Sequence, residues 1–170
     1  MKLTFAPRGV IQVEDARLYF NNFAGRGSMY NREGDRNFCL RIPTQEMADE
    51  LINEGFNVKI KEAREEGEEP FIYLKVNVKI HPHGHEYERL NPVAYLVTNG
   101  RKNELDADSI GIIDDIDILK VDLQFTGSDW SVNGRSGRSA YLKKIYVTQN
   151  VDDLDARYAD EEYPGEVPFN

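Results

Sequence analysis

The sequence predicts a mostly β fold of the α+β class, an antiparallel barrel or sandwich with one inserted helix. Short runs of alternating apolar and polar residues recur along the chain, as expected for strands that turn one face to a core. Turn-forming residues separate these runs, and only one stretch shows apolar residues at clear helical spacing. With 170 residues, the chain is long enough to form one domain with its own core.

The expected strands share this alternation. In order, they span residues 10–20, 36–42, 56–61, 71–80, 93–98, 116–125 and 139–148. The clearest is 71–80, where every second residue is aliphatic and the other face carries Tyr73, Lys75 and Lys79. Such a strand is typical of a sheet with one exposed face.

In the first strand, Ala16, Leu18 and Phe20 are expected to face the core, which leaves Arg17 and Tyr19 outside. A loop rich in Gly, Asn and Arg follows at 21–35. The second strand then turns Phe38, Leu40 and Ile42 inward.

The clearest helix spans 44–54, because Thr44 can cap it and Gly55 can end it. Its apolar stripe consists of Met47, Ala48, Leu51 and Ile52. After it, Phe56, Val58 and Ile60 are expected to point inward from the next strand. A second, short helix is expected at 106–113, and a Gly-rich loop with the only tryptophan at 126–138.

Charge is distributed unevenly along the chain. The net charge is −9, yet residues 17–41 hold five arginines against two acidic residues, a formal charge of +3. Residues 151–170 hold seven acidic residues and one arginine, which is −6 of the total. The sequence therefore predicts a domain at 1–150 and an acidic, disordered tail at 151–170.

Cations and aromatic rings recur together on the expected outward faces of several strands and in both Gly-rich loops. Single-stranded nucleic acid needs this combination, because cations follow the phosphates and flat rings stack on unpaired bases. The candidate nucleic-acid-binding residues are Arg17, Tyr19, Arg26, Tyr30, Arg32, Arg36, Arg41, Lys59, Tyr73, Lys75, Lys79, Trp130, Arg135, Arg138, Tyr141 and Lys143. Phe23, in the first loop, is a further ring of this kind. The alternative is that these residues only populate exposed strand positions and complete the core.

Enzyme motifs are missing from the sequence: it has no phosphate-binding loop, dinucleotide fingerprint or nucleophile elbow. Cys39 lies mid-strand and is interpreted as a structural thiol. His81, His83 and His85 alternate, but Pro82 and Gly84 favour a solvated turn over a metal site. We therefore expect neither an enzyme nor a cofactor or metal.

Aspartates cluster around the second expected helix, at positions 106, 108, 114, 115 and 117. A nuclease could place such carboxylates around Mg²⁺, but their spacing is that of helix caps and helix ends. A metal-dependent nuclease remains a minor alternative. A second alternative is an acidic interaction or inhibitor protein that acts on a host enzyme, which the net charge favours and the clustered arginines oppose.

The tail ends on an apolar plug, Val167-Pro168-Phe169, after the acidic residues Asp160, Glu161 and Glu162. This order is typical of a docking peptide, in which charges steer and an aromatic ring anchors. It resembles the tail of single-stranded DNA-binding proteins of the OB-fold kind. The body resembles those of bacteriophages, through the segment Asn31 to Ile42 and the closing strand Tyr141 to Thr148.

The resemblance implies an OB-fold-like barrel that binds single-stranded DNA without sequence preference and supports phage DNA replication or recombination. It also implies that the tail recruits replication and repair enzymes and competes with DNA for the groove. Asn170 follows the phenylalanine here, which departs from the family's tip. The single cysteine and the absence of an apolar span favour the cytoplasm of the bacterial host and no membrane association. The sequence leaves open whether the protein forms homo-oligomers and whether it prefers DNA to RNA.

Overall fold

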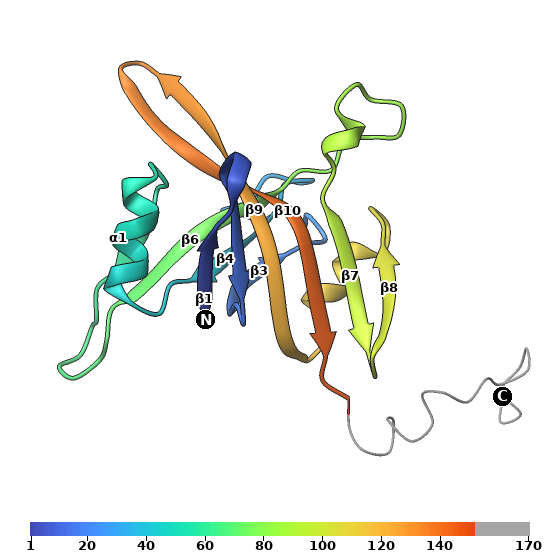
Figure 1. Cartoon of the computed structure of the whole chain (residues 1–170), viewed down its shortest axis with the longest axis horizontal. Coiled ribbons are helices and arrows are strands. Elements are labelled where there is room, and N and C mark those ends of the chain that lie inside the picture. Colours follow the sequence, from blue (N-terminus) through green and yellow to red (C-terminus); the bar gives the residue numbers. More distant parts are fainter. Residues whose placement is uncertain (152–170) are drawn as a thin grey trace, which may run out of the picture.

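A computed structural model describes residues 1–151 as one curled sheet with a single α-helix at one end (Figure 1). The helix α1 spans Gln45–Asn53. The strands are β1 (Lys2–Phe5), β2 (Val10–Glu14), β3 (Leu18–Asn22), β4 (Arg36–Arg41), β5 (Lys59–Lys61), β6 (Phe71–Val78), β7 (Val93–Thr98), β8 (Arg101–Leu105), β9 (Ile118–Val132) and β10 (Arg135–Gln149). Short 3₁₀ helices lie at Pro7–Gly9, Glu88–Leu90 and Ile110–Asp114. The predicted tail residues 152–170 lie outside the described residues.

The strand order is β1-β2-β9-β10-β6-β4-β3, with β5 beside β6 and the pair β7–β8 beside β10. This path stays open at its ends, so within residues 1–151 the barrel is partial. The mostly β fold with one inserted helix is confirmed. Two parallel pairs, β10 with β6 and β10 with β7, depart from the purely antiparallel sheet that the sequence suggested.

One hydrophobic core fills the inside of the curl. The aliphatic face of β6 enters it as predicted, and Phe38 and Leu40 of β4 are fully buried. Helix α1 contributes Ala48 and Leu51, both fully buried. Its N-cap is Thr44, whose hydroxyl accepts a hydrogen bond from the Met47 N–H at 3.2 Å. Burial of such apolar surface is the main stabilising term of the domain.

The predicted strand 10–20 is two strands, β2 and β3. Asp15 breaks it with a positive φ of 54° and donates its N–H to the Asp122 carboxylate. A register shift after Tyr19 then places Phe20 in a left-handed conformation and turns its ring outward. Phe20 is 71% exposed, so the prediction that it faces the core was wrong.

The predicted loop 126–138 is the outer part of the β9–β10 hairpin, which projects from the body as an arm (Figure 1). Its turn is Asn133-Gly134, and both residues have the positive φ that a tight hairpin turn requires. The other two glycines that suggested a loop, Gly127 and Gly137, lie within the strands. Gly137 is needed because the Trp130 ring covers it: a Cβ there would lie 2.8 Å from the indole.

Smaller differences have equally local causes. The helix expected at 106–113 is the 3₁₀ helix Ile110–Asp114, and β6 ends at Val78 rather than at residue 80. Ile52 and Ile60 were expected inside, but both are exposed, because α1 and β5 lie at the edge of the core. The strands β1 and β8, which lack clear alternation, were missed.

Asp114 ties the long β3–β4 loop to the body. Its carboxylate accepts the backbone N–H groups of Phe23 (2.8 Å) and Ala24 (3.0 Å). Arg36 holds the same loop from the other side, since its guanidinium donates to the carbonyls of Phe23 and Ala107. Together these bonds bury the Phe23 ring, which stacks on Phe38 at 5.2 Å.

Replacing Asp114 with alanine should lower the free energy of unfolding by about 1.5–3 kcal/mol, because two backbone donors lose a charged acceptor. Urea unfolding measures this change. Asp108→Ala is the matched control, since that side chain is exposed, and it should change stability by less than about 0.5 kcal/mol. Equal stability of the two variants would contradict the anchoring role.

Candidate nucleic-acid interface

The face of the sheet that points away from the core carries cations and rings in register across four strands. Opposite Tyr73 of β6 lie Arg41 of β4 on one edge and Lys59 of β5 on the other. The next row contains Lys75, Cys39 of β4 and Tyr19 of β3. We call these rows the outer face.

An aromatic cluster covers one end of the outer face. The ring of Phe71 lies 5.1 Å from Tyr19, 6.4 Å from Phe20 and 5.5 Å from Tyr73. An open hollow of about 460 Å³ lies beside Phe20 and Phe71. It is lined by two cations, Lys61 and Arg64, and by three carboxylates: Glu62, Glu68 and Glu69. Exposed rings with neighbouring cations provide stacking surfaces for unpaired bases.

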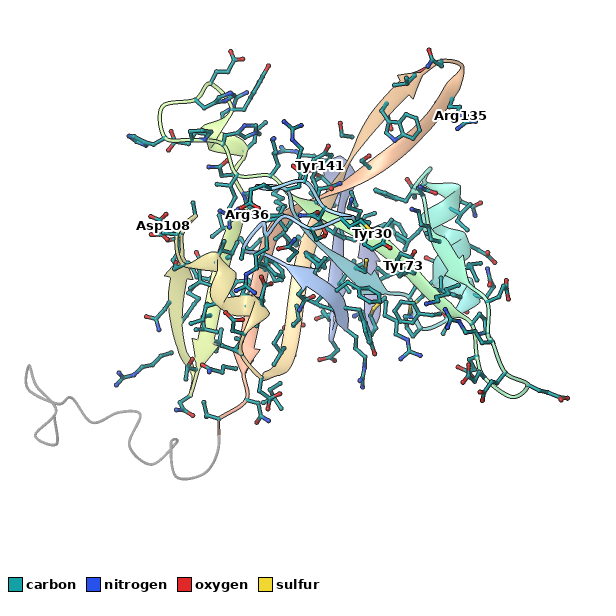
Figure 2. The ribbon with its side chains drawn as sticks, turned by 180° about the vertical axis from the view of Figure 1, so that it is seen from behind. Tyr30, Arg36, Tyr73, Asp108, Arg135 and Tyr141 are labelled. Atoms are coloured by element: carbon teal, nitrogen blue, oxygen red, sulfur yellow. The ribbon has the colours of Figure 1, made fainter. Side chains whose placement is uncertain are left out.

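At its other end the outer face continues onto β10. Tyr141 lies opposite Asn77 of β6, and Asn77 lies opposite Asn37 of β4. Figure 2 views the molecule from this side, with Tyr73, Tyr30 and Tyr141 on the visible surface. The β3–β4 loop reaches over this row, because Asn37 donates a hydrogen bond to the Asn31 side chain at 3.0 Å.

A second hollow, of about 520 Å³, opens beside Tyr141. β6 pairs with β10 at residues 140–141, and β7 pairs with β10 at residues 144–148. Between β6 and β7 the chain leaves the sheet as the 79–92 loop, and the hollow lies at this gap. At the same place β10 carries an extra residue, Lys143, in a bulge. We call this space the basic hollow.

Four cations and no carboxylate line the basic hollow. Lys79 and Arg89 belong to the 79–92 loop, and Lys143 and Lys144 lie at the bulge of β10. Leu90, Val93 and Leu142 give it an apolar wall. A phosphate with its attached nucleoside therefore finds charge and apolar surface together here.

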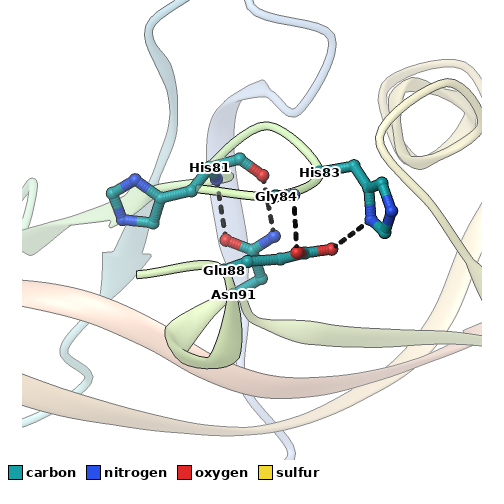
Figure 3. Close-up of polar contacts among 5 residues, drawn as sticks. All are labelled: His81, His83, Gly84, Glu88 and Asn91. Atoms are coloured by element: carbon teal, nitrogen blue, oxygen red, sulfur yellow. Dashed lines mark hydrogen bonds and ion pairs between the residues drawn. The ribbon is translucent and has the colours of Figure 1, made fainter. Parts of the chain in front are cut away.

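The 79–92 loop is held in shape by its own polar contacts (Figure 3). Asn91 closes its base, accepting the N–H of His81 at 2.7 Å and donating to the His81 carbonyl at 3.0 Å. Glu88 accepts the Gly84 N–H and contacts the His83 ring, which together hold the pKa of Glu88 below its ordinary value. Partial burial, and then the neighbouring His85, lower the pKa of His81, so His81 stays neutral to lower pH.

The β9–β10 arm carries Trp130 and Arg135 on the same side as Tyr141, because residues 135 to 141 alternate without a register shift. Arg135 lies near the tip of the arm (Figure 2). Arg138 lies on the opposite side and is occupied: it binds Asp129 at 2.7 Å and lies over the Phe56 ring. This hydrogen bond lowers the pKa of Asp129.

A family model described as "Putative phage ssDNA-binding domain" matches residues 3–166. The chain belongs to this family. The predicted phage single-stranded DNA-binding family and the DNA-binding function that its description names are thereby confirmed. A search of curated protein sequences gives no match.

Solved structures from bacteriophage Enc34 share the fold. The single-stranded DNA-binding protein of that phage, as a C-terminal truncation, has a TM-score of 0.54 at 14% identity, over 89% of this chain and 97% of that chain. The same protein in complex with ssDNA has a TM-score of 0.51 at 14% identity, over 88% and 92% of the two chains. At this identity the likeness concerns the fold alone.

For this family member, the structure sorts the residues that the sequence singled out. The outer face unites Tyr19, Arg41, Lys59, Tyr73 and Lys75. The basic hollow unites Lys79, Tyr141 and Lys143. Arg17, Arg26, Tyr30 and Arg32 are exposed around the outer face or on the β3–β4 loop. Three arginines are engaged by the protein itself: Arg36 and Arg138 through hydrogen bonds, and Arg26 through an ion pair with Asp115 at 3.8 Å. Phe23 is buried.

Sequence reasoning placed Lys61 on the outward face with Lys59, but it missed four other residues of these surfaces: Phe20, Phe71, Arg89 and Lys144. The signal for Phe71 was available, since it alternates with the aliphatic face of β6. The position of Lys144 could not be predicted without the bulge in β10, and that of Arg89 could not be predicted without the path of the 79–92 loop.

Three of the five aspartates of the nuclease alternative have structural hydrogen-bond partners. Asp106 accepts bonds from the hydroxyl and N–H of Ser109, which lower its pKa. Asp114 anchors the β3–β4 loop, and Asp117 binds the Asn150 side chain. Within residues 1–151, no group of His, Cys, Asp and Glu side chains is arranged to hold a metal ion. Nor is any helix in that range long and apolar enough to cross a membrane.

The double variant Lys143→Gln, Lys144→Gln tests the basic hollow. Each phosphate contact contributes about 0.7 to the slope of log K against log salt for single strands, so losing two should reduce the slope by about 1.4. Lys2→Gln is the control, because Lys2 lies on β1 and contacts Glu14 at 3.8 Å. A salt titration with oligo-dT measures the slope. If the double variant keeps the wild-type slope, as the Lys2→Gln control should, the basic hollow does not contact phosphates.

Proposed function

We propose that the protein binds single-stranded DNA along the outer face and into the basic hollow, without sequence preference. The observation that carries the proposal is that cations and rings from five strands share one surface, which continues into a hollow lined by four cations and no carboxylate. The acidic net charge does not oppose this, because two thirds of it belongs to residues 151–170.

The chemistry favours single strands over duplex DNA. The rings of Tyr73 and Tyr141 are accessible to unpaired bases, whose flat faces stack on them at about 1–3 kcal/mol per base. Every base has such a face, so binding of this kind tolerates any sequence. Lys75 and Arg41 stand next to the rings, where a phosphate backbone would follow the stacked bases.

The proposed contact residues are those of the sequence analysis without Arg36 and Arg138. The guanidinium of Arg36 donates to two backbone carbonyls, and that of Arg138 lies between two carboxylates, Asp129 and Glu54. The structure supplies five more from the same surfaces: Phe20, Lys61, Phe71, Arg89 and Lys144. Trp130 and Arg135 extend the surface along the arm.

The wider role follows from binding. A protein that coats single strands in the cytoplasm of a bacterial host would protect phage DNA during replication or recombination. We propose that it acts by binding alone and without a cofactor, which agrees with the aspartates that serve as structural hydrogen-bond acceptors. Two further proposals concern partners: the acidic tail, with Val167, Pro168 and Phe169 at its tip, docks replication or recombination enzymes, and copies of the chain associate.

The direct test is a titration of Trp130 fluorescence with an oligo-dT of about 30 nucleotides, long enough for one OB-type site. Trp130 is the only tryptophan and lies on the arm, so its signal reports the proposed surface. Absence of any binding at low salt, by fluorescence and by filter retention, would contradict the proposed function.

Tyr73→Ala and Tyr141→Ala should each weaken oligo-dT binding by about fivefold or more, because each removes a stacking ring. Fluorescence anisotropy of a labelled oligonucleotide measures the dissociation constants. Phe5→Ala is the matched control: this ring is 40% exposed on β1, away from the outer face, and its loss should leave affinity unchanged. If both tyrosine variants bind oligo-dT as tightly as the Phe5→Ala control, Tyr73 and Tyr141 do not contact the DNA.

Deleting residues 151–170 should strengthen DNA binding, because a segment of charge −6 no longer competes with the phosphates. The gain should be largest at low salt, where charges are least screened. Weaker binding after truncation would show that the tail supports DNA binding rather than opposing it.

A further inference from the structure

The tip of the β3–β4 loop is a tight turn with two large apolar residues at its corners. Ser28 and Asn31 close the turn with reciprocal backbone hydrogen bonds of 2.8 and 3.3 Å. Met29 and Tyr30 occupy the corners and are 89% and 93% exposed. Such positions ordinarily hold Gly, Pro, Asn, Asp or Ser. A local choice that contradicts turn chemistry and exposes apolar surface is typical of a functional site.

The turn is also held firmly. The Asn31 side-chain nitrogen lies 2.9–3.1 Å from the carbonyls of Arg26, Arg32 and Asp35, which share its two protons. The side-chain oxygen of Asn31 accepts from Asn37, on the outer side of β4. These bonds restrain the turn backbone, so the tip is organised before anything binds, which reduces the entropy cost of binding.

More bonds stiffen the loop below the tip. Asn22 and Arg26 exchange two hydrogen bonds of 2.9 and 3.0 Å. Glu33 turns its carboxylate back into the loop, where it accepts the Gly27 N–H at 2.6 Å. Arg26 and Arg32 are exposed beside the tip, and the Arg26 guanidinium lies 3.8 Å from the Asp115 carboxylate. Arg32 therefore gives the two apolar side chains a neighbouring cation for a phosphate.

The position of the turn agrees with this chemistry. Asn37, to which the turn is bonded, lies in the row that leads through Asn77 to Tyr141. In Figure 2, Tyr30 lies on the face that also displays Tyr73 and Tyr141. A strand that follows the outer face from Tyr73 toward the basic hollow passes the base of this turn.

We propose that Met29 and Tyr30 form a wedge that enters between two neighbouring bases of the bound strand and unstacks them. The inference rests on the proposed function and adds an activity to it: active disruption of base stacking. Apolar side chains, methionine among them, are inserted between base steps in other DNA complexes, at a cost of about a few kcal/mol for unstacking. Here the tyrosine ring replaces part of the lost stacking.

A wedge makes affinity depend on how strongly the strand stacks on itself. A thymine run has little stacking to lose, so the contact with the wedge is nearly all gain. An adenine run must first be unstacked, and this cost offsets the gain. Removing the wedge should therefore weaken binding to oligo-dT much more than binding to oligo-dA, whereas loss of a ring that only covers an already exposed base would weaken both equally.

The test compares the wild type with the double variant Met29→Ala, Tyr30→Ala on oligo-dT and oligo-dA of equal length. Ile52→Ala, on the exposed side of α1, is the control. The double variant should lose about 5- to 20-fold in affinity for oligo-dT and less than about 2-fold for oligo-dA. An oligo-dA with a central 2-aminopurine should brighten on binding the wild type, through unstacking, and brighten less with the double variant.

Equal losses on both oligonucleotides, or no loss on either, would overturn the wedge and leave the proposed function standing. No loss on either would assign the tip to another occupant, such as a protein partner. Failure of the wild type to bind oligo-dT would overturn the proposed function, and the wedge with it. The side chains of Met29 and Tyr30 are almost fully exposed, so unchanged thermal unfolding should confirm that the double variant is folded.

Discussion

A β-strand has two faces, and in this protein only one face of β6 fits the core. Ile72, Leu74, Val76 and Val78 are all at most 7% exposed, while both edges of the strand bind neighbours: β4 on one side, β5 and β10 on the other. The aromatic and lysine residues between the aliphatic ones are consequently forced onto a shared surface. The arrangement of Tyr73 and Lys75 with the cations of β4 and β5 follows from that single constraint.

The regular sheet alone would give a flat interface. Depth comes from two irregularities at one place, the departure of the chain between β6 and β7 and the bulge of β10 at Lys143. Both turn side chains toward the same space, and Asn91 fixes the loop that forms its wall. Irregular backbone thus supplies the charged hollow, while regular backbone supplies the rows of rings and cations on the outer face.

The sequence predicts what depends on local pattern: the two faces of β6 and β4 and the cap of α1 at Thr44. It does not predict what depends on partners distant in sequence. The burial of Phe23 depends on Asp114, which binds the backbone of its loop. Arg36 and Arg138 are engaged within the protein by Ala107 and Asp129, respectively. The arm at 126–138 was misread because glycines that accommodate Trp130 and Arg138 within strands resemble the glycines of a loop.

The central claim is that DNA covers the outer face, and Cys39 tests it directly. It is the only cysteine, and it lies in register between Tyr19 and Lys75. Burial raises the pKa of its thiol, so its alkylation is slow and easily followed at pH about 8. Saturating oligo-dT should slow alkylation of Cys39 strongly in the intact protein. An unchanged rate, with binding verified by anisotropy in the same solution, would contradict the claim.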